Sequence, residues 1–121
     1  MDDAFEILNV WKRSRRLAID IHETFSTCND YGIKSQITRA AASIPSSIAE
    51  GYERNSGKDF VNLLLLARES CTELQTQLSI CEEISLIEME TASKLEQETR
   101  EIHGILQGLI QYYKNKIKID P

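Results

Sequence analysis

Apolar residues recur every three or four positions along most of the chain, which is the spacing of one face of an α-helix. Four such stretches are separated by short runs rich in Ser, Asn, Asp and Gly, residues that favour turns. The spacing predicts helices over residues 4–26, 33–54, 57–83 and 88–116. No alternation of period two, the pattern of a half-buried strand, competes with this interpretation.

The third and fourth stretches space their apolar residues alternately by four and by three, the 3.5-residue repeat of helices that pack side by side. Short connections make consecutive helices antiparallel. We therefore predict an all-α fold, a single domain over residues 1–121 that forms an up-down-up-down four-helix bundle. The two seams expected in its core consist of Phe60, Leu64, Ala67, Cys71, Leu74, Leu78 and Cys81, and of Ala92, Leu95, Thr99, Ile102, Leu106, Leu109 and Tyr113.

Two serines mark possible helix starts. Ser56 with Asp59, and Ser85 with Glu88, have the spacing of a capping box, in which the serine side chain accepts a hydrogen bond from the backbone three residues on. This spacing predicts caps for the third and fourth helices.

Pro45 lies inside the second predicted helix, where a proline costs about 3 kcal/mol. In one interpretation it kinks a continuous helix, and Ser46 or water satisfies the freed carbonyl of Ala41. In the other the helix breaks, and Ser47 with Glu50 caps a restart. We favour the kink because the apolar stripe continues in phase across the proline, through Ile37, Ala41, Ile44 and Ile48.

The third helix has more apolar surface than a bundle seam needs. Its flanking residues widen the apolar arc to about 260°, which predicts either an oligomer interface or a thick bundle that buries the flanks itself. On the fourth helix, two glycines lie four apart opposite the seam, where they either admit another backbone closely or are neutral. The candidate interface residues are Val61, Leu63, Leu65, Leu66, Gly104 and Gly108.

The charged residues suggest two further candidate sites. The first is a basic cluster that either contacts nucleic-acid phosphates or forms a solvated face paired with nearby Glu6, Asp20 and Glu23; it contains Lys12, Arg13, Arg15 and Arg16. The net charge of −5 makes general nucleic-acid binding less favoured. The second is a partly buried polar network, expected to be structural, with a ligand cleft as the alternative; it contains Arg39, Glu50, Arg54, Arg68 and Glu73.

Signals of catalysis, metal binding or membrane insertion are missing. His22, Cys28 and His103 do not have the spacing of a zinc site, and no phosphate-binding loop or nucleophile elbow occurs. Cys71 and Cys81 fall on apolar helical positions and are expected to be small core residues. No apolar run approaches a membrane span, and no signal peptide is visible. We expect a cytoplasmic protein that is not an enzyme, with no cofactor and no small-molecule substrate.

Three segments resemble a known family. They are VWKRSRRLAIDIHETF at 10–25, YGIKSQITRAAASIPSSIAEGYERNS at 31–56 and FVNLLLLARESCTELQTQL at 60–78. The chain resembles the four-helix bundle proteins encoded in intervening sequences of bacterial 23S rRNA genes, a fold family that includes the accessory variability proteins of diversity-generating retroelements. The resemblance implies a ring-shaped homopentamer. For the retroelement branch it also implies a positive surface that binds nucleic acid and a reverse transcriptase partner, from which this acidic chain departs.

Two functions therefore remain open at this point. The leading hypothesis is a non-enzymatic, oligomeric bundle that acts as an interaction scaffold. The alternative is a nucleic-acid-binding accessory protein, for RNA or DNA, with a reverse transcriptase as a candidate partner.

Overall fold

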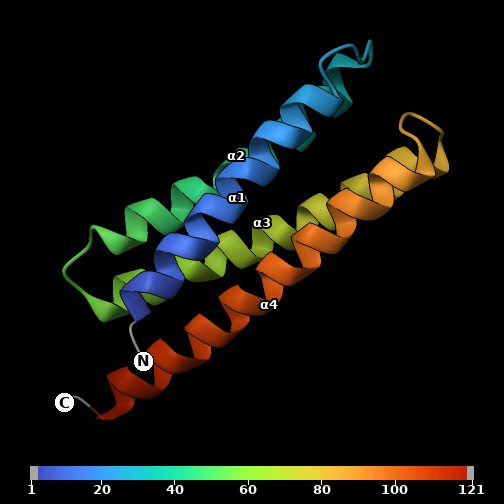
Figure 1. Ribbon diagram of the computed structural model, residues 1–121. Helices are drawn as coiled ribbons and strands as arrows, with labels where there is room; N and C mark the ends of the chain where they lie inside the picture. Colours follow the sequence, from blue (N-terminus) through green and yellow to red (C-terminus); the bar gives the residue numbers. More distant parts are fainter. Residues whose placement is uncertain (1–2, 120–121) are drawn as a thin grey trace.

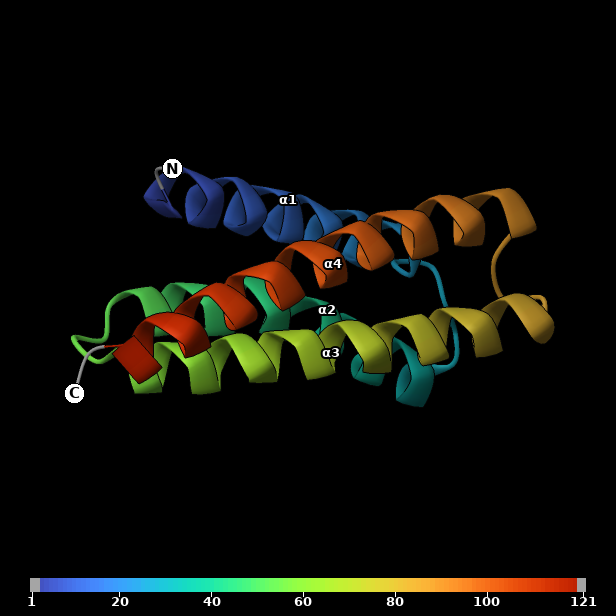
Figure 2. The ribbon, with the colours of Figure 1, turned by 90° about the horizontal axis from the view of Figure 1, so that it is seen from below.

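The computed structural model describes residues 3–119, which form four α-helices and no strand. They are α1 (Asp3–Thr24), α2 (Tyr31–Tyr52), α3 (Gly57–Glu83) and α4 (Met89–Ile119). Consecutive helices pack against each other in antiparallel directions, and α4 also packs against α1 (Figures 1 and 2). The backbones of the diagonal pairs, α1 with α3 and α2 with α4, do not come within 8 Å of each other, Cα to Cα. The predicted all-α, up-down-up-down four-helix bundle is confirmed.

The predicted seams form the core. Every member of the α3 seam and all but Tyr113 of the α4 seam are buried, and Tyr113 is partly buried against them. Burying a large apolar side chain contributes about 1.5–3 kcal/mol. Two buried hydroxyls avoid an unsatisfied donor by bonding to the preceding turn of their own helix. Ser14 donates to the Trp11 carbonyl at 3.0 Å, and Thr99 to the Leu95 carbonyl at 2.7 Å.

Side-chain caps set the starts of α2 and α3. The Asp30 side chain accepts a hydrogen bond from the backbone of Ile33 at 3.1 Å, so α2 begins two residues earlier than predicted. Tyr31 and Gly32 look like turn residues in the sequence but lie within the first turn of this helix. The Ser56 side chain accepts from the backbone of Asp59 at 3.3 Å, which confirms the predicted start of α3.

The turn between α3 and α4 differs from the prediction. Ser85 has a φ of 61°, the left-handed conformation that often follows the last residue of a helix. Its backbone N–H donates to the Glu82 carbonyl at 3.1 Å, and that of Leu86 donates to the Cys81 carbonyl at 2.8 Å. These two bonds define a Schellman motif. Ser85 therefore terminates α3, and the predicted Ser85–Glu88 cap for α4 is wrong.

Helix α2 continues without interruption through Pro45, whose ring is buried. The alternative in which the helix breaks and restarts is therefore wrong, while the size of any bend stays a prediction. We expected the Ser46 hydroxyl, or water, to satisfy the carbonyl of Ala41. The hydroxyl instead donates to the Ala42 carbonyl at 2.9 Å. Hydroxyl bonds of this kind to the preceding turn accompany bending in helices.

Two helices approach closely at Gly51, near the end of α2. A Cβ atom there would lie 2.8 Å from Cδ1 of Phe60 and 3.0 Å from Cβ of Leu63 on α3. The absence of a side chain lets the ring of Phe60 pack directly on the α2 backbone. At Gly104 and Gly108 on α4, by contrast, an added Cβ would meet nothing within 4 Å.

The glycines give a matched test. We expect Gly51→Ala to lower the free energy of unfolding by about 1–3 kcal/mol, because overpacking outweighs the helix propensity of alanine. Gly104→Ala and Gly108→Ala should each raise it by about 1 kcal/mol, since only propensity changes. Urea unfolding of the three variants measures both effects. A Gly51→Ala protein as stable as the wild type would contradict the close approach, and a stabilised Gly104/Gly108 double variant that assembles normally would exclude those glycines from an interface.

Candidate interaction surfaces

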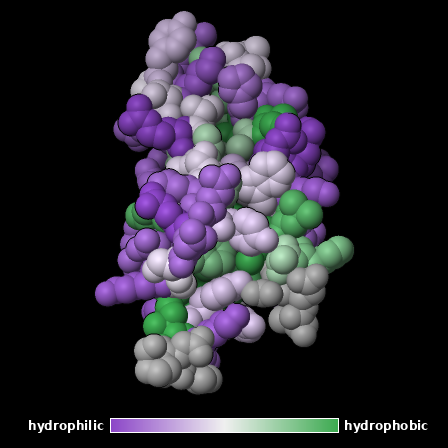
Figure 3. Space-filling model, turned by 90° about the vertical axis from the view of Figure 1, so that its left-hand side faces the viewer, coloured by the Kyte–Doolittle hydropathy of each residue, from purple (hydrophilic) through white to green (hydrophobic). Residues whose placement is uncertain are grey.

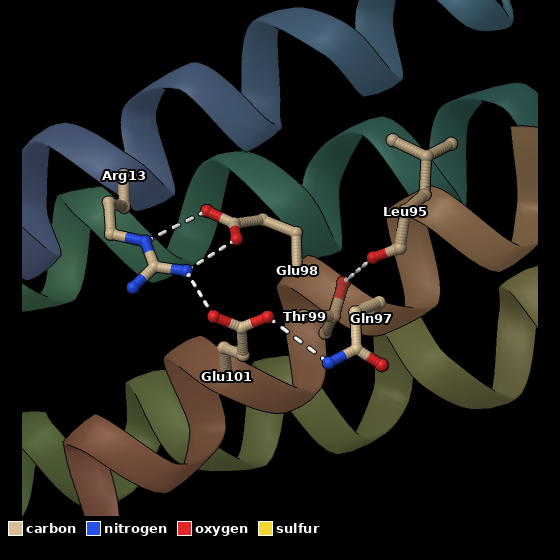
Figure 4. A network of polar contacts seen from close by, with 6 residues as sticks. All are labelled: Arg13, Leu95, Gln97, Glu98, Thr99 and Glu101. Atoms are coloured by element: carbon tan, nitrogen blue, oxygen red, sulfur yellow. Dashed lines mark hydrogen bonds and ion pairs between the residues drawn. The ribbon is translucent and has the colours of Figure 1, made fainter.

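Arg13 of the basic cluster faces another helix of the same chain. Its guanidinium spans the gap between α1 and α4, with Nε 3.0 Å from Oε2 of Glu98 and Nη2 2.5 Å from Oε1 of the same carboxylate (Figure 4). Nη2 also lies 2.9 Å from Oε1 of Glu101. A bidentate arginine–carboxylate pair is among the stronger polar interactions in proteins. Arg13 therefore joins two helices and is not free to bind phosphate.

The remaining members of the basic cluster divide into two kinds. Arg16 is paired along its own helix with Asp20, at 2.8 Å. Lys12 and Arg15 are exposed and have no hydrogen bond or ion pair with any part of the chain that the structure describes. The predicted four-residue patch thus contains two free cations, which is a smaller target for a nucleic-acid backbone than the sequence suggests.

The contacts of Arg13 with Glu98 and Glu101, which we call the Arg13 clamp, shift the pKa of Arg13 and that of Glu101. Hydrogen bonds from Arg13, and then from Gln97, hold the pKa of Glu101 below its ordinary value of 4.5. The hydrogen bonds to Glu98 and Glu101 raise the pKa of Arg13, which stays charged at any pH where the protein is folded. A carboxylate whose pKa is lowered by folding stabilises the folded state above its unfolded pKa and loses that contribution as the pH falls.

We expect Arg13→Met to lower the free energy of unfolding by about 1 kcal/mol near neutral pH, since the pair is partly exposed and partly screened. The difference from wild type should shrink as the pH falls from 4.5, the ordinary pKa, through the lowered pKa at which Glu101 becomes protonated in the folded protein. Urea unfolding across this pH range measures the change, and an NMR titration should show the pKa of Glu101 rising in the variant. Arg39→Met is the control, because Arg39 is exposed and has no hydrogen bond or ion pair among the described residues. If Arg13→Met lowered the free energy of unfolding equally at all pH values, Arg13 would not act as a charge partner of Glu101.

The predicted polar network does not form. Arg54 pairs locally with Glu50 at 2.9 Å, whereas Arg68 of α3 bonds to Gln107 of α4. Glu73 accepts from Gln77 of its own helix, and Arg39 has no partner among residues 3–119. The five side chains share neither a cleft nor a common set of bonds. Their helical spacing was correct, but most of them point to solvent from different helices and different levels of the bundle.

The candidate interface on α3 is largely covered by the chain itself. Val61 is only 6% exposed and belongs to the buried residues, so its assignment to an outer interface is wrong. Leu63 and Leu65 are half-buried, and Leu65 packs against the core. Leu66 remains 49% exposed, and Gly104 and Gly108 lie on exposed α4 surface. The alternative of a bundle that buries its own flanks accounts for most of the apolar surplus.

A larger exposed apolar surface lies elsewhere, between the first half of α1 and the last turns of α2. Phe5, Leu8 and Tyr52 are 73%, 48% and 55% exposed there. Together with Trp11, Ile48 and neighbouring side chains they line a groove of about 480 Å³. The space-filling view of this end of the molecule shows hydrophobic side chains at the surface beside hydrophilic ones (Figure 3). Sequence reasoning missed this groove, although Phe5 and Leu8 flank the α1 seam much as the leucines flank that of α3.

The two buried thiols, those of Cys71 and Cys81, are poorly suited to nucleophilic chemistry. Burial raises the pKa of Cys71 to about 12 and also raises that of Cys81. Thiols of this kind stay protonated and inert. Within residues 3–119, no three His, Cys, Asp or Glu side chains are grouped so as to hold a metal ion. In the same part of the chain, no helix is both long and apolar enough to cross a membrane.

The arrangement of helices defines the class as an antiparallel four-helix bundle with an exposed apolar groove. The sequence matches the model of the 23S rRNA-intervening sequence protein family over residues 6–108, and the chain belongs to this family. A solved structure from Bacteroides thetaiotaomicron, a protein of unknown function from the S23 ribosomal protein family, superposes with a TM-score of 0.82. The two are 23% identical, over 88% of this chain and 98% of the other, so this likeness shows the fold alone. A comparison with curated proteins found no match.

Proposed function

We propose that the protein is a non-enzymatic homo-oligomeric scaffold of the cytoplasm, whose bundle presents docking surfaces to other molecules. The groove between α1 and α2 carries this proposal. Soluble monomers rarely leave aromatic and aliphatic side chains clustered at the surface, and such clusters mark interaction sites. Three exposed large apolar residues, Phe5, Leu8 and Tyr52, lie around this one groove.

The polar side chains support a scaffold more than a catalyst. Arg13 and Arg68 each bond to α4 and thereby connect helices of the bundle. Arg16 and Arg54 are held by carboxylates one turn away. These contacts stabilise helices and helix pairs, and none of them orients a nucleophile beside a base in the way that catalysis requires.

The resemblance to the family implies how many copies the oligomer contains, namely five subunits in a ring. A ring needs two different surfaces on each subunit, one for each neighbour. The exposed groove supplies one such surface, and Leu66 with the open α4 face marks other surface that the fold leaves uncovered.

Static light scattering coupled to size-exclusion chromatography tests the oligomer. We expect a mass well above the 13.8 kDa of the chain at micromolar concentration, near five times that value for the ring. Dilution should reveal whether the assembly dissociates. A mass of one chain over the whole concentration range would refute the oligomeric scaffold.

The alternative is a nucleic-acid-binding accessory protein, which Lys12 and Arg15 favour as two exposed cations on one helix. The net charge of −5 and the pairing of Arg13 and Arg16 weigh against it. Two phosphate contacts also give little affinity at physiological salt, because each contact depends on the release of condensed counterions.

Fluorescence anisotropy with labelled single-stranded RNA and double-stranded DNA separates the two functions. We expect no saturable binding at about 150 mM salt, where phosphate contacts are screened. Affinity that falls steeply with salt and drops in a Lys12→Ala/Arg15→Ala variant, but not in Arg39→Ala, would instead favour the accessory protein.

A further inference from the structure

The apolar groove has a charged border. Lys12 lies four residues after Leu8, and Arg15 lies four residues after Trp11, so each cation follows a groove residue one helical turn along α1. Both cations are exposed and unpaired among the described residues. A ligand that fills the groove therefore meets apolar side chains, two positive charges beyond the groove on α1, and the carboxylate of Glu53 in the lining on α2. A segment that combines large apolar residues with carboxylates suits the α1 side of this surface, away from Glu53.

The turn between α3 and α4 has the complementary composition. Ile80, Ile84, Leu86 and Met89 are 51%, 55%, 38% and 73% exposed, an unusual concentration of apolar side chains for a helix connection. We call the segment 80–89 the tip. It also contains Glu82, Glu83 and Glu88, none of which has an ion pair within the described part of the chain.

The backbone of the tip is already ordered. The Schellman bonds that close α3 hold Ser85 and Leu86 in place, and Ile87 packs against the core. A preformed segment loses little conformational entropy when it binds, so more of the contact energy appears as affinity.

The groove and the tip lie at opposite ends of the bundle. The first turns of α1 and the last turn of α2 are at one end, and the α3–α4 connection is at the other (Figure 1). One chain therefore cannot fill its own groove with its own tip. A second copy can, and the contact is then of the head-to-tail type, in which each subunit offers one groove and one tip.

We propose that the tip of one copy docks into the α1–α2 groove of the next, with apolar side chains of the tip in the groove and Glu83 and Glu88 facing Lys12 and Arg15. This inference rests on the proposed oligomeric function and names the two surfaces that build the assembly. Complementary charges specify the partner and the register of the contact. A contact made by one turn segment and one groove is small compared with the interfaces of stable complexes. Closure into a ring strengthens it, because each subunit is then held at two places.

A charge-reversal experiment tests the contact. The groove variant is Lys12→Glu/Arg15→Glu, and the tip variant is Glu83→Lys/Glu88→Lys. In each, like charges face one another, and we expect the concentration at which the assembly dissociates to rise about ten-fold or more. When all four substitutions are combined in one chain, the pairs are restored with opposite polarity, and the mass of the assembly should return to that of the wild type.

Matched controls use charges away from both surfaces. Arg39→Glu reverses an exposed, unpaired cation of α2, and Glu69→Lys reverses an exposed carboxylate of α3. Both should leave the mass unchanged. Circular dichroism verifies that all variants fold, which is expected because every substitution lies on the surface.

The outcomes distinguish this contact from the oligomeric function itself. If each variant assembles more weakly and the combined chain regains the mass of the wild-type assembly, the result supports docking of the tip into the groove. An oligomer whose mass is unaffected by either reversal, or a loss without recovery, overturns the docking and leaves the scaffold standing. A wild-type protein that is monomeric at all concentrations overturns both.

Discussion

Burial of the α3 seam is the constraint on which the rest of the molecule depends. This helix lies between α2 and α4, and its seven seam residues are all nearly inaccessible to solvent. Gly51 admits Phe60 to the α2 backbone on one side, and Phe60 stacks edge-on against Tyr113 of α4 on the other, with ring centroids 4.9 Å apart. A single aromatic ring thus ties three helices together at one end of the bundle. Such pairs contribute about 0.5–1.5 kcal/mol beyond the area they bury.

Helix α1 is held in a different way. Its backbone does not come close to that of α3 and approaches α4 over a shorter stretch than α2, and part of its surface stays uncovered. The Arg13 clamp lies where α1 meets α4, and a directional charge pair there supplements the apolar packing. The same incomplete cover leaves Phe5 and Leu8 at the edge of the groove. The polar clamp and the exposed groove are therefore two consequences of the position of one helix.

The distribution of charge follows from this packing as well. Four cations lie close together in the α1 sequence. Arg13 pairs with Glu98 of α4, and Arg16 pairs with Asp20 one turn away. The two that remain free lie beside the groove, and the carboxylates of Glu82, Glu83 and Glu88 lie in the same segment as the exposed apolar side chains at the other end of the molecule. In a chain with a net charge of −5, which repels its own copies at long range, such local complementarity is what selects a particular contact.

The sequence by itself determined the fold class, the helix count and nearly all of the core. These follow from periodicity, because a side chain every three or four residues must lie on one helical face whatever the partner is. Cap residues such as Ser56 were readable for the same reason, since their bonds are local. The Schellman turn at Ser85 was not, because a serine with positive φ has no clear sequence signal.

Only the tertiary structure decided which surfaces are free. The sequence placed Val61 on the outside, and packing of α3 between its neighbours covered it. The sequence grouped Arg13 with three other cations, and a carboxylate 85 residues away engaged it. It also joined five polar residues into a network that the bundle keeps apart. Periodicity reports the direction of a side chain from its own helix, whereas exposure and pairing depend on what the other helices bring to the same place.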